Sequence, residues 1–100
     1  MYVVREVFTA KPGQAGKLAK LFKKTLASQA QARVLTDLIG NYNTVVMEFM
    51  VASLADYEKL LADYKSGKLT EGIDQTTAEE MSRYSEMYQS GRREVLQVVE

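Results

Sequence analysis

The chain has 100 residues, of which 46% are hydrophobic and 26% charged, and its 13 basic and 13 acidic residues give a formal net charge of zero. This length and composition are typical of a single globular domain over residues 1–100, and the balanced charge gives no reason to expect nucleic acid or a membrane as a partner. The sequence contains no cysteine and no histidine, which excludes disulfides, thiolate chemistry and histidine ligands for zinc or haem, so we expect no metal site and no cofactor.

The first part of the chain predicts a strand followed by a helix. Residues 2–10, YVVREVFTA, are rich in valine and aromatic side chains and predict a strand. The turn residues Pro12 and Gly13 end it. From residue 15 the apolar period becomes helical, which predicts a helix over 15–30. Its apolar side is formed by Leu18, Leu21, Phe22 and Leu26.

Two further strands are predicted over residues 33–39 and 44–52. Both segments are rich in apolar and β-branched side chains. The connection between them, residues 40–43, reads GNYN. Glycine and asparagine tolerate positive φ, so this segment suits a hairpin connection.

A second helix is predicted to begin after Ser53 as its N-cap and to end at Gly67. Its apolar stripe consists of Leu54, Tyr57, Leu60, Leu61 and Tyr64. The next segment, residues 68–75, is the least regular of the chain and predicts either a loop or a short helical turn.

The last quarter predicts a helix and a final strand. Thr77 and Glu80 match a capping box at the start of a helix over 76–91, with Gly91 as its end. Residues 92–100, RREVLQVVE, predict the fourth strand.

This order of elements, β-α-β-β-α-(α)-β, is that of the ferredoxin-like split βαβ motif. The expected fold class is α+β, with a four-stranded antiparallel sheet whose helices cover one face. The other face of the sheet is then left open.

Side-chain alternation divides each strand between these two faces. In the strand over 44–52 the uniformly apolar set, expected under the helices, is Val45, Met47, Phe49 and Val51. Glu48 then points to the open face. In the first strand we assign Glu6 to the open face too, with its neighbours by alternation, Tyr2, Val4 and Phe8. In the last strand one face combines Arg92 and Glu94 with Leu96 and Val98.

An open face that places a few charged residues among apolar ones fits neither a solvated surface nor a buried core. A sheet packed on a partner around a small cavity explains both the apolar and the charged residues, and a homodimer is the simplest form of that partner. The alternative is a monomer that leaves part of an apolar sheet exposed, which is a liability in water.

Glu6 and Glu48 are the main candidates for a ligand pocket. If both lie on the open face of central strands, they can line one cavity, where a carboxylate could act as a general base or orient a ligand. The alternative is a structural ion pair with Arg5, Arg92 or Arg93.

The other pocket candidates are Arg92, Arg93, Tyr42 and Thr36. One of the two arginines should face inward, where it could bind a carboxylate or phosphate; the alternative is an ion pair with Asp37, Glu48 or Glu94. Tyr42, at the hairpin tip, could close a pocket mouth or cap the core. Thr36 and Asp37 lie on opposite faces of their strand, so at most one faces the cavity.

Three segments, REVFTAKPG, RVLTDLIGNYNTVVMEF and SGRREV, together with the order of elements, resemble the dimeric α+β barrel superfamily. This group includes NIPSNAP-like proteins, antibiotic-biosynthesis-type monooxygenases and many uncharacterised members, and the uncharacterised members are the most similar. The resemblance implies that two open sheets face each other in a barrel, with a pocket between sheet and helices or inside the barrel.

The resemblance does not transfer an activity residue by residue. The cofactor-free monooxygenases use Trp, Asn, Arg or His in the pocket, whereas this sequence has no Trp or His and its asparagines, Asn41 and Asn43, fall in the hairpin connection. Haem-degrading members hold iron through a histidine. Val4 stands where the stress-responsive members often place one.

We therefore expect a small-molecule-binding homodimer of unassigned activity, with a pocket at the sheet or barrel for a small apolar or aromatic ligand. One alternative is a cofactor-independent monooxygenase or isomerase acting on a small aromatic or lactone-like substrate. Another is a purely structural dimer with a filled barrel. No signal peptide or membrane-length apolar run is present, so the cytoplasm is the expected location.

Overall fold

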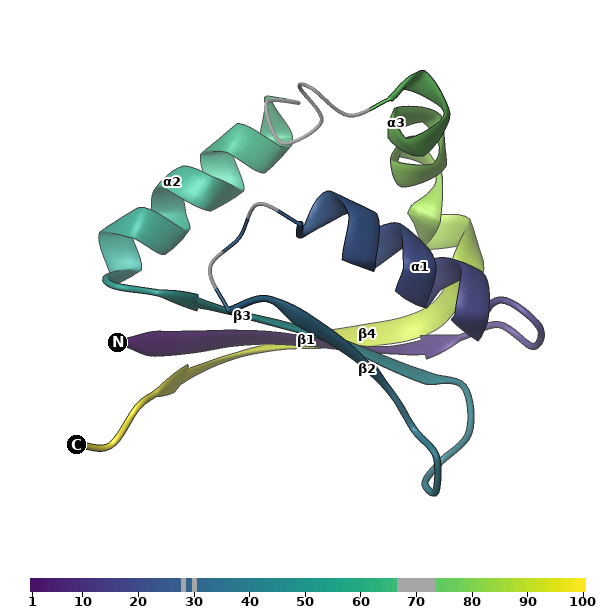
Figure 1. Ribbon diagram of the computed structural model, residues 1–100, viewed down its shortest axis with the longest axis horizontal. Coiled ribbons are helices and arrows are strands. Elements are labelled where there is room, and N and C mark those ends of the chain that lie inside the picture. Colours follow the sequence, from purple (N-terminus) through teal and green to yellow (C-terminus); the bar gives the residue numbers. More distant parts are fainter. Residues whose placement is uncertain (28, 30, 67–73) are drawn as a thin grey trace.

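The computed structural model describes residues 1–27, 29, 31–66 and 74–100. It confirms the predicted α+β, ferredoxin-like fold: the helices cover one face of a four-stranded antiparallel sheet and leave the other uncovered (Figure 1). The elements are β1 (Tyr2–Ala10), α1 (Ala15–Thr25), β2 (Arg33–Thr36), β3 (Thr44–Val51), α2 (Leu54–Lys65), α3 (Gln75–Ser82), the 3₁₀ turn η2 (Tyr84–Met87) and β4 (Tyr88–Gln97).

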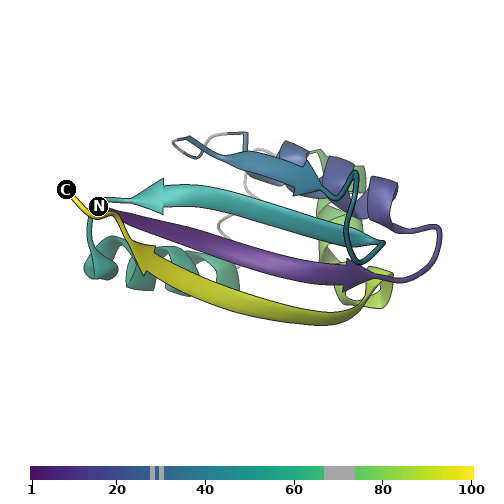
Figure 2. The same ribbon diagram turned by 90° about the horizontal axis from the view of Figure 1, so that it is seen from below.

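The strand order β2-β3-β1-β4 places β3 and β1 in the middle of the sheet and β2 and β4 at its edges (Figure 2). Residues opposite each other in neighbouring strands share a face. Glu6 of β1 stands opposite Met47 of β3 and Arg93 of β4. One residue earlier, Arg5 stands opposite Glu48. This register decides which side chains meet on each face.

The core lies between α1 and the sheet. Leu18, Leu21 and Phe22 of α1 are buried, as their helical spacing predicts. Four aromatic rings form the centre of one cluster: Phe8, Phe22, Tyr84 and Tyr88. A second cluster joins the other end of the sheet to α2 through Val4, Phe49, Val51, Tyr57 and Leu60. The helix α2 itself has no fully buried residue.

Side-chain caps set the beginnings of α2 and α3. Ser53 caps α2 as predicted, because its Oγ accepts the Asp56 N–H at 3.1 Å. The capping box predicted at Thr77 is wrong: Asp74 is the N-cap of α3 and accepts from both the N–H and the Oγ1 of Thr77 at 2.8 Å. Thr77 is instead buried in the first turn.

The predicted helix end at Gly91 is also wrong. After α3 the chain makes the short turn η2 and enters β4 at Tyr88, so Gly91 lies within a strand, opposite Phe8. The glycine serves packing there, since an added Cβ would lie 2.9 Å from Cδ1 of Phe8.

The other differences concern element ends. The first helix and the second strand are shorter than the predicted 15–30 and 33–39, and the last strand occupies Tyr88–Gln97 rather than 92–100. The predicted helix end at Gly67, and most of the irregular segment 68–75, lie outside the described residues.

Candidate functional site

The structure corrects the face assigned to Glu6. Val4 and Phe8 are buried beneath the helices, so the alternating set that contains Glu6 faces α1 and α2. The assignment of β3 is confirmed, with Val45, Phe49 and Val51 buried on the helix side and Glu48 on the open side. Glu6 and Glu48 therefore lie on opposite faces, and the expectation that they line one cavity is wrong.

A cavity of about 440 Å³ lies between the sheet, α1, α2 and α3. Its walls are mainly apolar: Phe22, Leu26, Met47, Phe49, Leu60, Leu61, Ala78 and Met81. Of the predicted apolar stripe of α2, all members except Leu54 line this space: Tyr57, Leu60, Leu61 and Tyr64. Because α2 buries no side chain fully against the sheet, the volume beneath it is left free.

An ion pair between Glu6 and Arg93 lines this cavity. Nε and Nη2 of Arg93 lie 2.8 and 2.7 Å from the same carboxylate oxygen, Oε1 of Glu6. Burial by itself would lower the pKa of Arg93, but the hydrogen bond and charge of Glu6 outweigh burial and raise this pKa. Arg93 is thus the inward-facing member of the arginine pair and stays charged.

Three tyrosines add hydroxyl groups to the cavity wall. A hydrogen bond of 3.1 Å joins the hydroxyls of Tyr64 and Tyr84. Burial raises the pKa of Tyr84, and this hydrogen bond raises it further. Burial also raises the pKa of Tyr57, while the charges of Arg93 and Glu6 act on it in opposite directions. Tyr57 and Tyr84 are therefore neutral phenols at neutral pH.

The hydroxyl of Tyr57 is buried and has no hydrogen-bond partner among the described residues. Such a group costs about 1–3 kcal/mol unless something satisfies it. The sequence analysis placed Tyr57 and Tyr64 on an apolar helix stripe and did not assign them to a cavity. The sequence did indicate that the hydroxyls of Tyr57 and Tyr64 lie on the same side of the helix, because the two residues are seven positions apart.

Glu48 belongs to an ion-paired cluster on the open face. Oε2 of Glu48 lies 2.9 and 2.7 Å from Nε and Nη2 of Arg5, and Oε1 lies 2.9 and 2.8 Å from the same atoms of Arg33. Burial alone would raise the pKa of Glu48, but the hydrogen bonds and charges of both arginines outweigh burial and lower this pKa. Both oxygens are thus engaged, and Arg33 is a partner that sequence reasoning missed.

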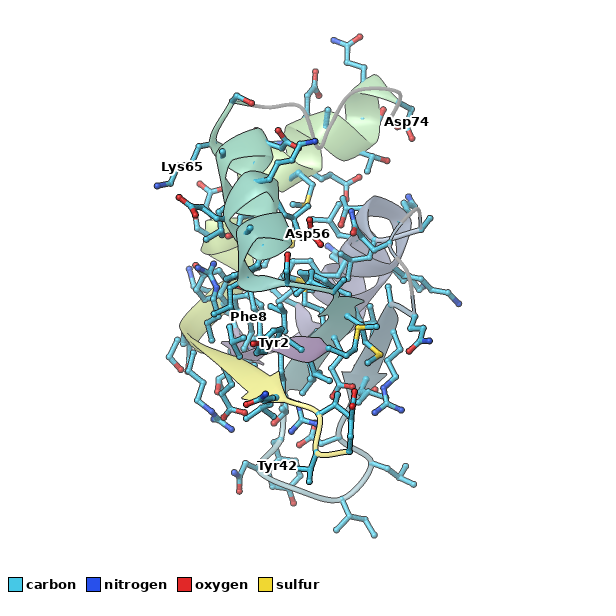
Figure 3. All side chains as sticks on the ribbon, turned by 90° about the vertical axis from the view of Figure 1, so that its left-hand side faces the viewer. Tyr2, Phe8, Tyr42, Asp56, Lys65 and Asp74 are labelled. Atoms are coloured by element: carbon cyan, nitrogen blue, oxygen red, sulfur yellow. The ribbon has the colours of Figure 1, made fainter. Side chains whose placement is uncertain are left out.

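The remaining candidates do not line the cavity. Arg92 points to the open face, where its Nε lies 3.1 Å from Glu94. Thr36 ends β2 and is exposed. Tyr42 is exposed at the hairpin tip, far from α2 and α3 (Figure 3). Asp37 instead shapes the hairpin, because its Oδ1 accepts the Thr44 N–H at 3.0 Å.

Among the described residues, no group of three or more acidic, histidine or cysteine side chains is arranged to hold a metal ion. No helix in the described ranges has the length and apolar character needed to cross a membrane.

No protein-family model matches this sequence, and no curated protein matches it. Solved structures do match. A NIPSNAP family protein from Agrobacterium tumefaciens is 23% identical, with a TM-score of 0.70 over 98% of this chain and 92% of that one. An uncharacterised NIPSNAP domain protein from Burkholderia xenovorans is 14% identical, with a TM-score of 0.70 over 99% and 95%. An antibiotic biosynthesis monooxygenase is 10% identical, with a TM-score of 0.66 over the whole of both chains.

The chain has the fold of NIPSNAP family proteins. This confirms, for the fold, the resemblance drawn from the sequence. At these identities the NIPSNAP fold assigns no activity, because one fold hosts many functions. Function must therefore be argued from the cavity and the open face of this chain.

Proposed function

We propose that the chain binds a small apolar molecule with one polar group in the cavity between α2 and the sheet. The observation that carries this proposal is a largely apolar space of about 440 Å³ into which an ion pair and tyrosine hydroxyls converge. Ligand sites have this size and this combination of apolar walls with a few placed polar groups.

The charges of the wall favour a neutral polar group on the ligand. Glu6 and Arg93 neutralise each other, and Lys65, which also borders the cavity, is exposed to water. Both contacts from Arg93 fall on Oε1 of Glu6, so Oε2 can accept a further hydrogen bond. A hydroxyl or carbonyl group suits such a site better than a full charge, which would have to compete with the existing pair.

Filling the cavity tests the proposal. Ala78→Phe places a ring in the lining, and Ala62→Phe places the same ring on the exposed side of α2. With the neutral dye Nile red as probe, we expect the first variant to weaken binding at least about tenfold and the second to leave it unchanged, as measured by fluorescence titration. Equal binding to both variants, with native circular dichroism, would place the dye elsewhere and refute the cavity as the site.

Catalysis in the same cavity is the weaker alternative. Among its described lining residues, Glu6 is the one carboxylate, and Arg93 holds it in an ion pair. Glu48 lies on the other face with both oxygens engaged. We therefore place ligand binding ahead of a cofactor-independent monooxygenase or isomerase.

We also propose that two copies associate through their open faces. The apolar side chains on this face are half-buried or exposed: Val3, Val7, Leu35, Val46, Met50 and Leu96. Between them lies a row of four residues that stand opposite one another in neighbouring strands. The row crosses the sheet in the order Arg33, Glu48, Arg5, Glu94. Its charges alternate, so a second row stacked in the reverse direction would place opposite charges together along its whole length.

A pair of leucines on opposite faces tests this association. Leu96, on the open face, is 44% exposed, and Leu54, on α2, is 55% exposed. We expect the unmutated chain to sediment at twice the monomer mass of 11.2 kDa at micromolar concentration. Leu96→Glu should weaken the dimer at least about tenfold by burying a charge, and Leu54→Glu should not change it. A monomeric unmutated chain, or equal effects of both variants, would refute this interface.

A further inference from the structure

The connection between β2 and β3 carries three large apolar side chains in water. Leu38, Ile39 and Tyr42, here called the hairpin tip, are 96%, 94% and 82% exposed. Single exposed apolar residues are ordinary, but three within five positions form a patch of the kind that marks an interaction site. None of the three lines the cavity, so the ligand-binding proposal does not account for them.

The hairpin tip has a defined and strained shape. Oδ1 of Asp37 accepts the Thr44 N–H, and the carbonyl of Asn43 accepts the Ala10 N–H at 2.8 Å, which ties the base of the tip to the sheet. Tyr42 has a φ of 65° and Asn43 a φ of 58°. The left-handed region is unfavourable for a bulky residue such as Tyr42. A fixed, strained turn that keeps apolar side chains exposed to water is suited to contact another surface.

The direction of the tip favours a partner on the open face. The connection leaves the sheet on the side away from the helices and extends past one end of the open face (Figure 1). Tyr42 lies at the opposite extreme of the molecule from α2 and α3 (Figure 3). The segment 37–44 contains no lysine or arginine, so it lacks the positive charge that anionic membrane surfaces attract. A protein surface is the better match.

The charged row on the open face determines where a second copy would place its own tip. Reverse stacking of the rows requires a two-fold axis that runs along the strands. Rotation about that axis exchanges the edges of the sheet but keeps its ends, so both tips come to the same end of the pair. In such an isologous interface every contact occurs twice, and residues that lie near the axis meet their own counterparts.

We infer that the hairpin tips of two copies pack against each other and close one end of the dimer. This inference rests on the proposed association through the open faces. Contact between Leu38, Ile39 and Tyr42 of the two copies removes from water the largest exposed apolar side chains of the described connection and accounts for the strain at Tyr42.

Single cysteines test the contact directly, because the chain has none of its own. Ile39→Cys treated with a short bismaleimide should give a covalent species of twice the monomer mass in high yield. Lys17→Cys, exposed on α1 on the helix side, is the matched control and should give little of it. The sedimentation of each untreated variant is measured in parallel.

The outcomes separate the tip contact from the dimer itself. If Ile39→Cys sediments as a dimer but cross-links no better than Lys17→Cys, the tips do not meet and the inference is overturned while the dimer stands. If cross-linking requires Ile39→Cys together with Val99→Cys, the copies run in opposite directions, which also overturns it. If the unmutated chain is monomeric, the open-face association itself has failed.

Discussion

Replacing Gly91 with valine is expected to lower the free energy of unfolding by about 2 kcal/mol, the range found when a packed site is overfilled. A Cβ at this position would lie 2.9 Å from Cδ1 and 3.0 Å from Cε1 of Phe8. The ring cannot easily move aside, because its centroid is 5.1 Å from that of Phe22 and 4.8 Å from that of Tyr88. The substitution therefore disturbs the whole aromatic cluster.

Urea denaturation measures this loss, and Gly16→Ala is its matched control. Gly16 lies in α1 with nothing within 4 Å of an added Cβ. Alanine is favoured over glycine in a helix, so Gly16→Ala should raise the free energy of unfolding by about 0.5–1 kcal/mol. A destabilised Gly16→Ala, or a Gly91→Val variant as stable as the unmutated chain, would contradict the packing around Phe8.

Glu48→Gln is expected to lower the free energy of unfolding by about 2 kcal/mol at neutral pH, since it removes a charge that accepts hydrogen bonds from two arginines. The matched control is Glu94→Gln on the same face. Glu94 meets one arginine, Arg92, in a more exposed pair, so its replacement should cost less than about 1 kcal/mol. Urea denaturation at one fixed protein concentration compares the two variants.

The pH dependence gives a second measurement for Glu48. Its pKa in the folded chain lies below the ordinary value, so the unfolded chain takes up the proton first as the pH falls. The contribution of Glu48 is complete above about pH 5 and is lost on further acidification through the folded pKa. The unmutated chain should therefore lose more stability between about pH 5 and pH 3 than Glu48→Gln does. An identical loss in both would show that the arginines do not stabilise the carboxylate.

The same variant separates the two faces of the sheet. Because Glu48 lies opposite the cavity, Glu48→Gln should leave Nile red binding unchanged at a pH where the chain is folded. Weakened binding in the folded variant would return Glu48 to the ligand site and contradict the assignment of the cavity to the helix side.

The sequence predicted an element and its orientation correctly where apolar residues repeat along only one side of the strand or helix. The strand over Thr44–Val51 has one uniformly apolar face, so its alternation placed Glu48 on the open side correctly. The helix Ala15–Thr25 carries a single apolar stripe, which became the core-facing side. Local hydrogen bonding also worked at Ser53, where the capping residue and its target are three positions apart.

Prediction failed where several local patterns were equally plausible. Thr77 and Glu80 matched a capping box, but Asp74, which precedes them, offers a carboxylate that accepts both bonds from Thr77. Gly91 suited a helix end, yet its role is to make room for a ring more than eighty positions away in the sequence. A signal confined to a few residues cannot report a contact of that kind.

By itself the sequence determined the order of elements, the ferredoxin-like fold, the orientation of the third strand and the absence of histidine and cysteine chemistry. Only the tertiary structure decided the face to which Glu6 belongs. Both faces of the first strand are apolar, because β1 lies in the middle of the sheet, so alternation alone could not choose between them. The pairing of Arg5 with Glu48 and of Glu6 with Arg93 made the choice, since residues opposite each other in a sheet share a face. Because of this register, the single pocket expected around Glu6 and Glu48 is replaced by two separate features. These are a cavity lined by Glu6 and Arg93 on the helix side, and an ion-paired cluster around Glu48 on the open face.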